Sequence, residues 1–303
     1  MTLNDQYDVF IKQLETRRRN PAKPSTLTAY SSHWRTHISK ELGHLDLETI
    51  KNGIMRQFVA TLSEKNLSAA SINSVTQLVK SIISSCVDSN GDRVCNTVWN
   101  NDFLDLPPIE NQNAPVMTRQ TLQDALGRTQ GQFRTLCTLA AGSGCRISEI
   151  LSLRVGSRSE SSFWDPEGSK LVIKTALWRG IEQSTKTKAG QREVDLCEEL
   201  NQYLLDQKPK TEFLFAGPDG NSLRIRTLYD QAQKAGILGF HSARRWRVTH
   251  LRANRVPEDI IQFWIGHSSN KSITDRYSKL AQNIEERKKY ANEAGLGFNL
   301  VAA

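Results

Sequence analysis

The stretch WIGHSSNKSITDRY, residues 264–277, places His267 ten residues before Tyr277. A phenol oxygen can attack as a nucleophile, and an imidazole can donate or carry a proton, so the two side chains suit group-transfer chemistry. Three other segments carry side chains that suit a phosphate group: GSGCRISEILSLR (142–154), STKTKAGQREVDL (184–196) and HSARRWRVTHL (241–251). Their guanidinium and ammonium groups are the usual ligands of phosphate oxygens. The candidate residues in these three segments are Arg146, Glu149, Lys186, Lys188, His241 and Arg244.

Taken singly, each of these residues also has an ordinary structural explanation. Arg146 follows a glycine turn and could be a surface charge at a helix start, and His241 could be a packing histidine. Tyr277 could belong to the core, with Tyr290 as the other tyrosine nearby. Only the four segments taken together, in this order, favour a functional interpretation over these structural explanations.

The composition favours a polyanionic partner. The chain has 303 residues, enough for two domains with separate cores, and a formal net charge of +8. The sequence has no apolar run of membrane-spanning length, and MTLNDQYDVF lacks the features of an export signal, so we expect a cytoplasmic protein. The five cysteines form no CxxC pair, which predicts reduced thiols and no zinc site.

The first half reads as an all-helical domain over about 1–105. Apolar spacing predicts helices over residues 5–16, from Ser25 or Thr26 to about residue 38, and within 45–66 and 67–87. Ser68 is the expected N-cap of the fourth helix. The proline-bearing segment 106–115 is the expected linker.

A basic segment in this half is either a solvated face or a phosphate-contacting surface. Residues 11–40 hold seven Lys or Arg against one acid. On the second interpretation, its DNA-contacting residues are Arg17, Arg18, Arg19, Lys23, Ser25, Thr26 and Arg35.

The second half, 116–303, is expected to be an α+β domain. Segments 170–178, 181–187 and 192–196 alternate well enough for a small antiparallel sheet of three strands among many helices. In the helix predicted around residue 245, Arg244 and Arg247 share a face and Arg245 points elsewhere. We therefore interpret Arg245 and Arg247 as phosphate-contacting or surface arginines.

Together the four segments resemble the tyrosine recombinase (phage-integrase, Xer-like) superfamily. That family reads G-x-R-x-x-E-x-x-x-L, a Lys in a β-hairpin turn, H-x-x-R, and L-G-H before a Tyr. The resemblance covers the whole chain, because it implies an N-terminal core-binding domain, a SAM-like helical bundle, joined to the catalytic domain. It implies site-specific recombination of double-stranded DNA: integration, excision, resolution or transposition. We expect no cofactor, no metal and no membrane.

The resemblance also implies the role of each site residue. Tyr277 would attack the phosphodiester and form a covalent 3′-phosphotyrosyl intermediate. Arg146, Arg244 and His267 would neutralise the charge on the non-bridging oxygens. His241 would donate or accept a proton beside the phosphate, and Glu149 would orient the site from the helix that carries Arg146. Lys186 would protonate the departing 5′-oxygen, with Lys188 as its local rival.

Two positions depart from the family pattern. The step of ten residues from His267 to Tyr277 is about one longer than usual, and Trp264 replaces the commoner leucine. Both tryptophan and leucine fill apolar space. The longer step bears on how the tyrosine helix is reached.

Three other classes of protein share part of these features. A metal-dependent nuclease, or a transposase with an acidic triad, would need clustered carboxylates, whereas the Asp and Glu of this sequence are dispersed. A type IB topoisomerase has the same catalytic set but relaxes supercoils as a monomer. A catalytically inactive relative would keep DNA binding alone.

Assembly is the last expectation. The resemblance implies a tetramer on two DNA sites, and accessory DNA-bending proteins as further partners. We expect no separate arm-binding domain before the first helix. The apolar C-terminal tail, residues 293–303, should dock either on its own domain or, as in related recombinases, on the neighbouring protomer.

Overall fold

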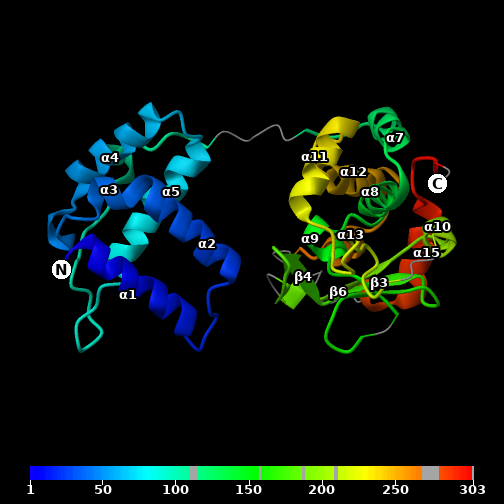
Figure 1. Cartoon of the computed structure of the whole chain (residues 1–303), viewed down its shortest axis with the longest axis horizontal. Helices are drawn as coiled ribbons and strands as arrows, with labels where there is room; N and C mark the ends of the chain where they lie inside the picture. The colour runs from blue at the N-terminus through cyan, green and yellow to red at the C-terminus, as the bar shows by residue number, and fades with distance from the viewer. Residues whose placement is uncertain (110–114, 157, 186–187, 208–210, 268–279, 302–303) are drawn as a thin grey trace. The chain divides into compact units, whose positions relative to one another are not determined.

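The computed structural model describes residues 1–109, 115–156, 158–185, 188–207, 211–267 and 280–301. The chain divides into two compact units, Met1–Asn113 and Ala114–Ala303 (Figure 1). Each unit has its own cluster of buried apolar side chains. Among the described residues, no helix combines the length and the apolar character needed to cross a membrane.

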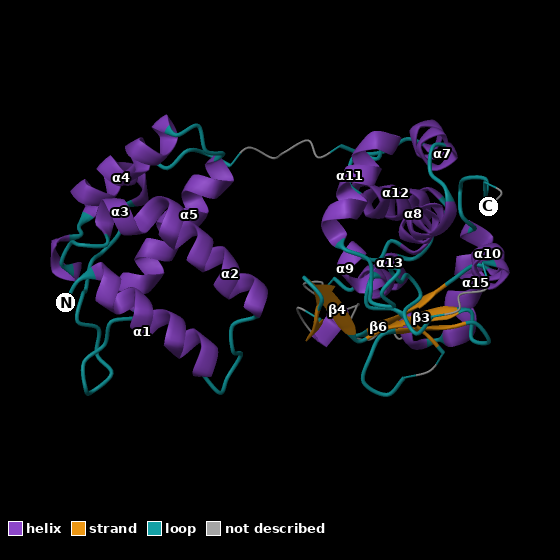
Figure 2. Cartoon of the chain, viewed as in Figure 1, coloured by secondary structure: helices purple, strands orange, loops and turns teal. Residues whose placement is uncertain are grey.

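The described part of the first unit contains helices and isolated β-bridges (Figure 2). Its elements are α1 (Leu3–Thr16), α2 (Pro24–His33), the π-helical η1 (Trp34–Ile38), α3 (Ser39–Leu42), η2 (Leu47–Thr49), α4 (Asn52–Glu64), α5 (Ala69–Ser84) and α6 (Asn101–Leu104). The core includes Leu3, Ile38, Met55 and Ile82, each fully buried. Tyr7 stacks on Trp34 with ring centroids 4.0 Å apart, which fixes α1 against η1.

Helix starts in this unit test the capping expectations. The Ser68 hydroxyl accepts a hydrogen bond from the amide of Ser71, so the predicted N-cap of α5 is confirmed. The cap of α2 was predicted wrongly. Lys23 occupies the cap position and Pro24 the first helical turn, so Ser25 and Thr26 lie inside the helix. Proline is favoured there because its missing N–H would be unpaired anyway.

The second unit combines helices with two small sheets. Its helices are α7 (Arg119–Gly127), α8 (Gly131–Ser143), α9 (Ile147–Ile150), η3 (Lys188–Gly190), α10 (Glu198–Asp206), α11 (Ile225–Ala235), α12 (Phe240–Ala253), α13 (Glu258–Ile265), η4 (Leu280–Gln282) and α15 (Ile284–Ala294). Its strands are β1 (Arg154–Val155), β2 (Phe163–Asp165), β3 (Lys170–Ile173), β4 (Thr175–Trp178), β5 (Ile181–Ser184) and β6 (Arg192–Asp195). Figure 2 shows the strands gathered on one side of the unit and helices α8, α11 and α12 on the other.

The sheet differs from the predicted three antiparallel strands. Four strands pair in the order β1-β2-β3-β6, with β1 and β2 parallel and the other pairs antiparallel, and β4 and β5 form a separate hairpin. The segment predicted as one strand, 170–178, breaks at Lys174. There the Ser162 hydroxyl accepts hydrogen bonds from the amides of Lys174 and Thr175. These two amides bond a side chain instead of a neighbouring strand, so the chain leaves one sheet and enters the other.

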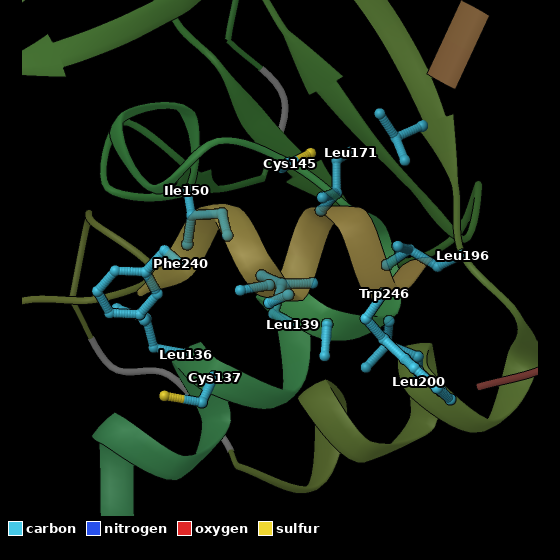
Figure 3. Packing of buried hydrophobic residues seen from close by; sticks show 14 of the residues in the cluster. Leu136, Cys137, Leu139, Cys145, Ile150, Leu171, Leu196, Leu200, Phe240 and Trp246 are labelled. Atoms are coloured by element: carbon cyan, nitrogen blue, oxygen red, sulfur yellow. The ribbon is translucent and has the colours of Figure 1, made fainter. Parts of the chain in front are cut away.

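Helices α8 and α12 cross at the centre of the second core. Leu136, Leu139 and Ile150 are fully buried, and Phe240 and Trp246 of α12 pack into the same cluster (Figure 3). Because α12 is anchored along its apolar face, the position of its polar side chains is fixed by the core.

The C-terminal tail docks on its own unit. Leu296 and Phe298 are buried in the second core, with 1% and 4% of their surface exposed. The Gln123 side chain bonds both backbone groups of Asn299, at 3.0 and 2.8 Å. Of the two predicted docking modes, the described residues adopt the one within the chain.

Candidate active site

Arg244 is the centre of the candidate site. It lies on the inner face of α12, with 4% of its surface exposed, and its Nη1 donates to the carbonyl oxygen of Gly144 at 2.8 Å. Its Nη2 donates to the carbonyl of Ile265, the last residue of α13. Gly144 adopts a left-handed conformation (φ +69°), which ends α8 just before Arg146. Arg244 therefore joins α12 to the turns that precede Arg146 and His267.

Arg146 lies at the N-cap of α9 and is tied to Glu149. The Arg146 amide donates to Glu149 Oε2 at 2.9 Å, and its Nη1 donates to Oε1 at 2.8 Å. The Arg146 side chain is 40% exposed, whereas Glu149 is buried. Burial opposes ionisation of Glu149, but Arg192 and Arg146 outweigh it and lower its pKa below the ordinary value. Glu149 is therefore a carboxylate that holds the backbone and the side chain of Arg146.

A cavity of about 420 Å³ opens beside these groups. Its lining includes His241, Arg244, Arg245 and His267. Glu258 also lines it, and its carboxylate is paired with Arg252 at 2.9 Å. The charged side chains of the lining are three arginines, Arg244, Arg245 and Arg252, and one carboxylate, so the lining has a net positive charge that suits a phosphate group.

Positive charge and burial shift the titration of this wall. Burial, with Arg146 next to it, lowers the pKa of Arg244 to about 10, which still leaves it charged at neutral pH. Burial and the nearby arginines also lower the pKa values of His241 and His267. The two imidazoles are therefore mainly neutral in the free protein at pH 7 and can each donate one N–H and accept one hydrogen bond.

Four of the six predicted catalytic residues thus lie in the described part of the second unit and interact electrostatically: Arg146, His241, Arg244 and His267. Lys186 and Tyr277 lie outside the described residues. The backbone of Lys188 begins η3.

The predicted DNA-contacting arginines of α12 differ from each other. Arg245 is partly exposed, lines the cavity and donates to the carbonyl of Pro115 at 3.2 Å. Arg247 is 3% exposed and donates to the carbonyl of Gly295. It holds the C-terminal tail, which corrects the expectation that it contacts DNA. The helical period explains the error, because the face that Arg247 shares with Arg244 is the inner one.

In the first unit, Arg17, Arg18, Arg19 and Arg35 are exposed. Lys23, Ser25 and Thr26 are partly exposed at the start of α2, a helix without any buried residue. Tyr30 of this helix packs against the first core, and the side of the helix away from that contact is available for another surface.

Sequence reasoning missed three buried residues that hold the site: Arg192, Asp195 and Arg287. Arg192 bonds Glu149, and Asp195 accepts hydrogen bonds from Trp264 Nε1 at 2.8 Å and Arg287 Nε at 2.7 Å. Arg192 and Val194 alternate along β6, so an arginine shares the buried face of a strand. A charged residue at an inward strand position is the signal that could have revealed it.

Comparison with known proteins identifies the family. The model of the phage integrase family matches residues 115–283, which is more than half of the chain. The chain belongs to the phage integrase family. It is therefore a tyrosine recombinase, and the motif-based prediction of the family is confirmed.

The fold of this chain is similar to the folds of solved integrase structures. The integrase of transposon Tn1549 bound to transposon right-end DNA matches with a TM-score of 0.68 and 18% identity, covering 93% of this chain and 99% of the other. A lambda integrase dimer on a COC′ core site matches with a TM-score of 0.67 and 15% identity, covering 100% and 99%. A lambda integrase tetramer on a Holliday junction matches with a TM-score of 0.65 and 17% identity, covering 90% of this chain and 80% of the other. A search of curated proteins finds no match.

Proposed function

We propose that this tyrosine recombinase cuts and rejoins double-stranded DNA at specific sites through a phosphotyrosine at Tyr277. The observation that carries the proposal is the convergence of Arg244, His241 and His267 on one cavity, with Arg146 held beside them by Glu149. A pentacoordinate phosphorus gathers negative charge on its non-bridging oxygens. Fixed guanidinium and imidazole donors stabilise that charge more than they stabilise the ground state.

The reaction exchanges one phosphoester bond for another at each step. The Tyr277 oxygen would attack phosphorus and give its proton to His241 while the bond to the 5′-oxygen breaks, and Lys186 would give that oxygen a proton. The tyrosine then carries the 3′-phosphate, and a 5′-hydroxyl of another strand reverses the step and releases the phenol. Each cycle leaves the number of phosphodiester bonds unchanged, so no nucleotide hydrolysis is needed.

The first unit would be the core-binding domain. Its exposed arginines and the partly exposed polar residues at the start of α2 support contact with DNA phosphates along the backbone. The relatives solved on DNA include a dimer on a core site and a tetramer on a junction. By analogy we propose that four copies of this chain act on two sites, with accessory DNA-bending proteins as further partners.

A nicked suicide duplex tests the chemistry. On a denaturing gel the wild type should form a covalent protein–DNA adduct that persists in EDTA. Tyr277→Phe should remove the adduct while half-site binding stays nearly unchanged, because the hydroxyl adds little affinity.

Tyr290→Phe is the matched control, because it removes the same hydroxyl group from a tyrosine that packs against the second core. This variant should still form the adduct. An adduct that survives Tyr277→Phe, or one that needs a metal ion, would overturn the proposal. Lys186→Ala should impair cleavage more than Lys188→Ala, and the reverse order would assign the general acid to Lys188. Relaxation of supercoils on DNA with a single site would favour a topoisomerase.

A further inference from the structure

Arg192 connects the three parts of the site that the motifs place far apart in sequence. Its side chain is almost fully buried in the second unit. Its Nε donates to the carbonyl of Trp264 at 2.5 Å, three residues before His267, and its Nη1 donates to Gly190 at 3.0 Å, at the end of η3. Its Nη2 also contacts the Cys145 sulfur at 3.9 Å, and both Nη atoms donate to Glu149 of α9, the helix that Arg146 caps.

The Glu149 carboxylate has no unused acceptor position. Oε1 accepts from Arg146 Nη1 at 2.8 Å and from Arg192 Nη1 at 3.2 Å. Oε2 accepts from the Arg146 amide at 2.9 Å and from Arg192 Nη2 at 3.0 Å. A carboxylate offers about four lone-pair sites, so these four bonds saturate it. Arg192 donates to both oxygens, and the Arg146 side chain donates only one bond to Glu149.

We propose that Arg192 is a positioning residue that keeps Glu149 from capturing Arg146. A free carboxylate pairs with a guanidinium through two parallel hydrogen bonds. Without Arg192, Glu149 could form that pair with Arg146 and occupy the N–H groups that should meet the scissile phosphate. With Arg192 in place, Arg146 is oriented by one bond and keeps its other donors open. The proposal rests on the proposed function, in which Arg146 contacts that phosphate.

A purely structural role predicts a different response to substitution. If Arg192 acted only by holding the Trp264 carbonyl, then changing Glu149 would not repair the loss of Arg192, since that carbonyl stays without its donor. If Arg192 acts through Glu149, then neutralising Glu149 should repair much of the loss. The two roles therefore differ in whether the substitution at residue 149 restores the rate that is lost by the substitution at residue 192.

Adduct formation on the suicide duplex, in single turnover with saturating protein, measures that coupling. Arg192→Met should slow the step by about 100-fold, the scale of losing one transition-state donor. The double variant R192M/E149Q should be at least about tenfold faster than Arg192→Met, because the competing charge is gone. A double variant as slow as or slower than Arg192→Met would overturn the proposal. All rates are compared at a temperature where thermal unfolding shows each variant folded.

Arg192→Lys keeps the proposal testable if Arg192→Met does not fold. A lysine can hold one carboxylate oxygen only, so its rate should lie between those of the wild type and Arg192→Met. The rate of Arg192→Lys is then compared with that of the double variant R192K/E149Q. A double variant that is as slow as or slower than Arg192→Lys again overturns the proposal.

A second readout does not depend on cleavage. In the Tyr277→Phe background, a neutral methylphosphonate at the scissile position should weaken half-site binding more when Arg192 is present than in Arg192→Met, where the contribution of Arg146 is lost. If the wild type forms no adduct but this difference appears, the proposed chemistry fails and the positioning role stands. Equal discrimination in both proteins overturns the positioning role alone.

Discussion

Among single residues, Arg244 shows how the site combines structure and chemistry. Two of its N–H groups hold the carbonyls of Gly144 and Ile265, so the turns before Arg146 and His267 are fixed relative to α12. A guanidinium has five N–H donors, and the rest remain for a ligand in the cavity that Arg244 lines. A lysine could not do both, because it has three donors on one nitrogen.

The two cavity histidines predict an opposite pH dependence for stability and for DNA binding. Their folded pKa values lie below the ordinary value of 6.5. As pH falls, the unfolded chain therefore takes up protons first. The stability contribution of these histidines, full above about pH 6.5, is lost as pH falls through their folded pKa values. A DNA phosphate attracts the protonated forms, so binding should raise both pKa values and take up protons.

Half-site affinity should accordingly rise between about pH 7.5 and 5.5 while the free protein loses stability. Fluorescence anisotropy and thermal unfolding across that range measure the two trends. Replacing His241 and His267 by glutamine should flatten both, whereas His44→Gln, at an exposed position in the first unit, should flatten neither. Half-site affinity that decreases as the pH is lowered would contradict the assignment of these histidines to the phosphate.

Among the elements, β6 organises the second unit. It pairs with β3, and its side chains reach α9, α13 and α15. Arg287 of α15 is 3% exposed and pairs with Asp195 and Glu193 of β6, each at 2.7 Å. The helix that follows the Tyr277 segment is thus anchored to the strand that follows the Lys186 segment.

Arg287→Met should therefore be strongly destabilising. It leaves Asp195 buried without its charged partner, which costs about 3–5 kcal/mol. Arg252→Met is the matched control, because the Arg252–Glu258 pair is largely exposed and should contribute only about 0–1 kcal/mol. Denaturant unfolding of both variants measures the difference, and equal losses would show that the Arg287 pair contributes no more than a surface pair.

Particular elements show what the sequence could and could not predict. The Ser68 cap and the helix positions followed from local signals, because capping and apolar spacing depend on nearby residues. The break at Lys174 depends on Ser162, a partner twelve residues away, which no local pattern contains. The site arginines were found from motifs. Arg192 was missed because its role depends on Glu149, 43 residues earlier in the chain.

At the scale of the whole chain, the +8 net charge and the exposed basic segment predict salt-dependent DNA binding. Reversing Arg17, Arg18 and Arg19 to glutamate should weaken half-site binding and reduce the slope of log affinity against log salt. The control reverses three exposed basic residues elsewhere in the first unit, Lys51, Arg56 and Arg93, with the same change in net charge. Equal effects in the two variants would restore the solvated-face interpretation of the basic segment.

The C-terminal tail is the second feature that acts at this scale. Its described residues are part of the second core, and Arg247 and Gln123 hold their backbone at Gly295 and Asn299. Deleting residues 295–303 should therefore lower the melting temperature of the second unit. Loss of Phe298 alone is comparable to a Phe→Ala change in a core, about 3–5 kcal/mol.

The resemblance to recombinases that pass this segment to a neighbour adds a second expectation. A tail held within its own chain competes with any neighbour, so exchange needs protomers brought close together on DNA, where the effective concentration is high. The truncated protein, assayed below its melting temperature, should then bind one half-site normally but lose cooperative binding to paired half-sites. Gel-shift titration on single and paired half-sites measures this. Unchanged cooperativity would mean that the tail only completes its own core, and an unchanged melting temperature would contradict its place in that core.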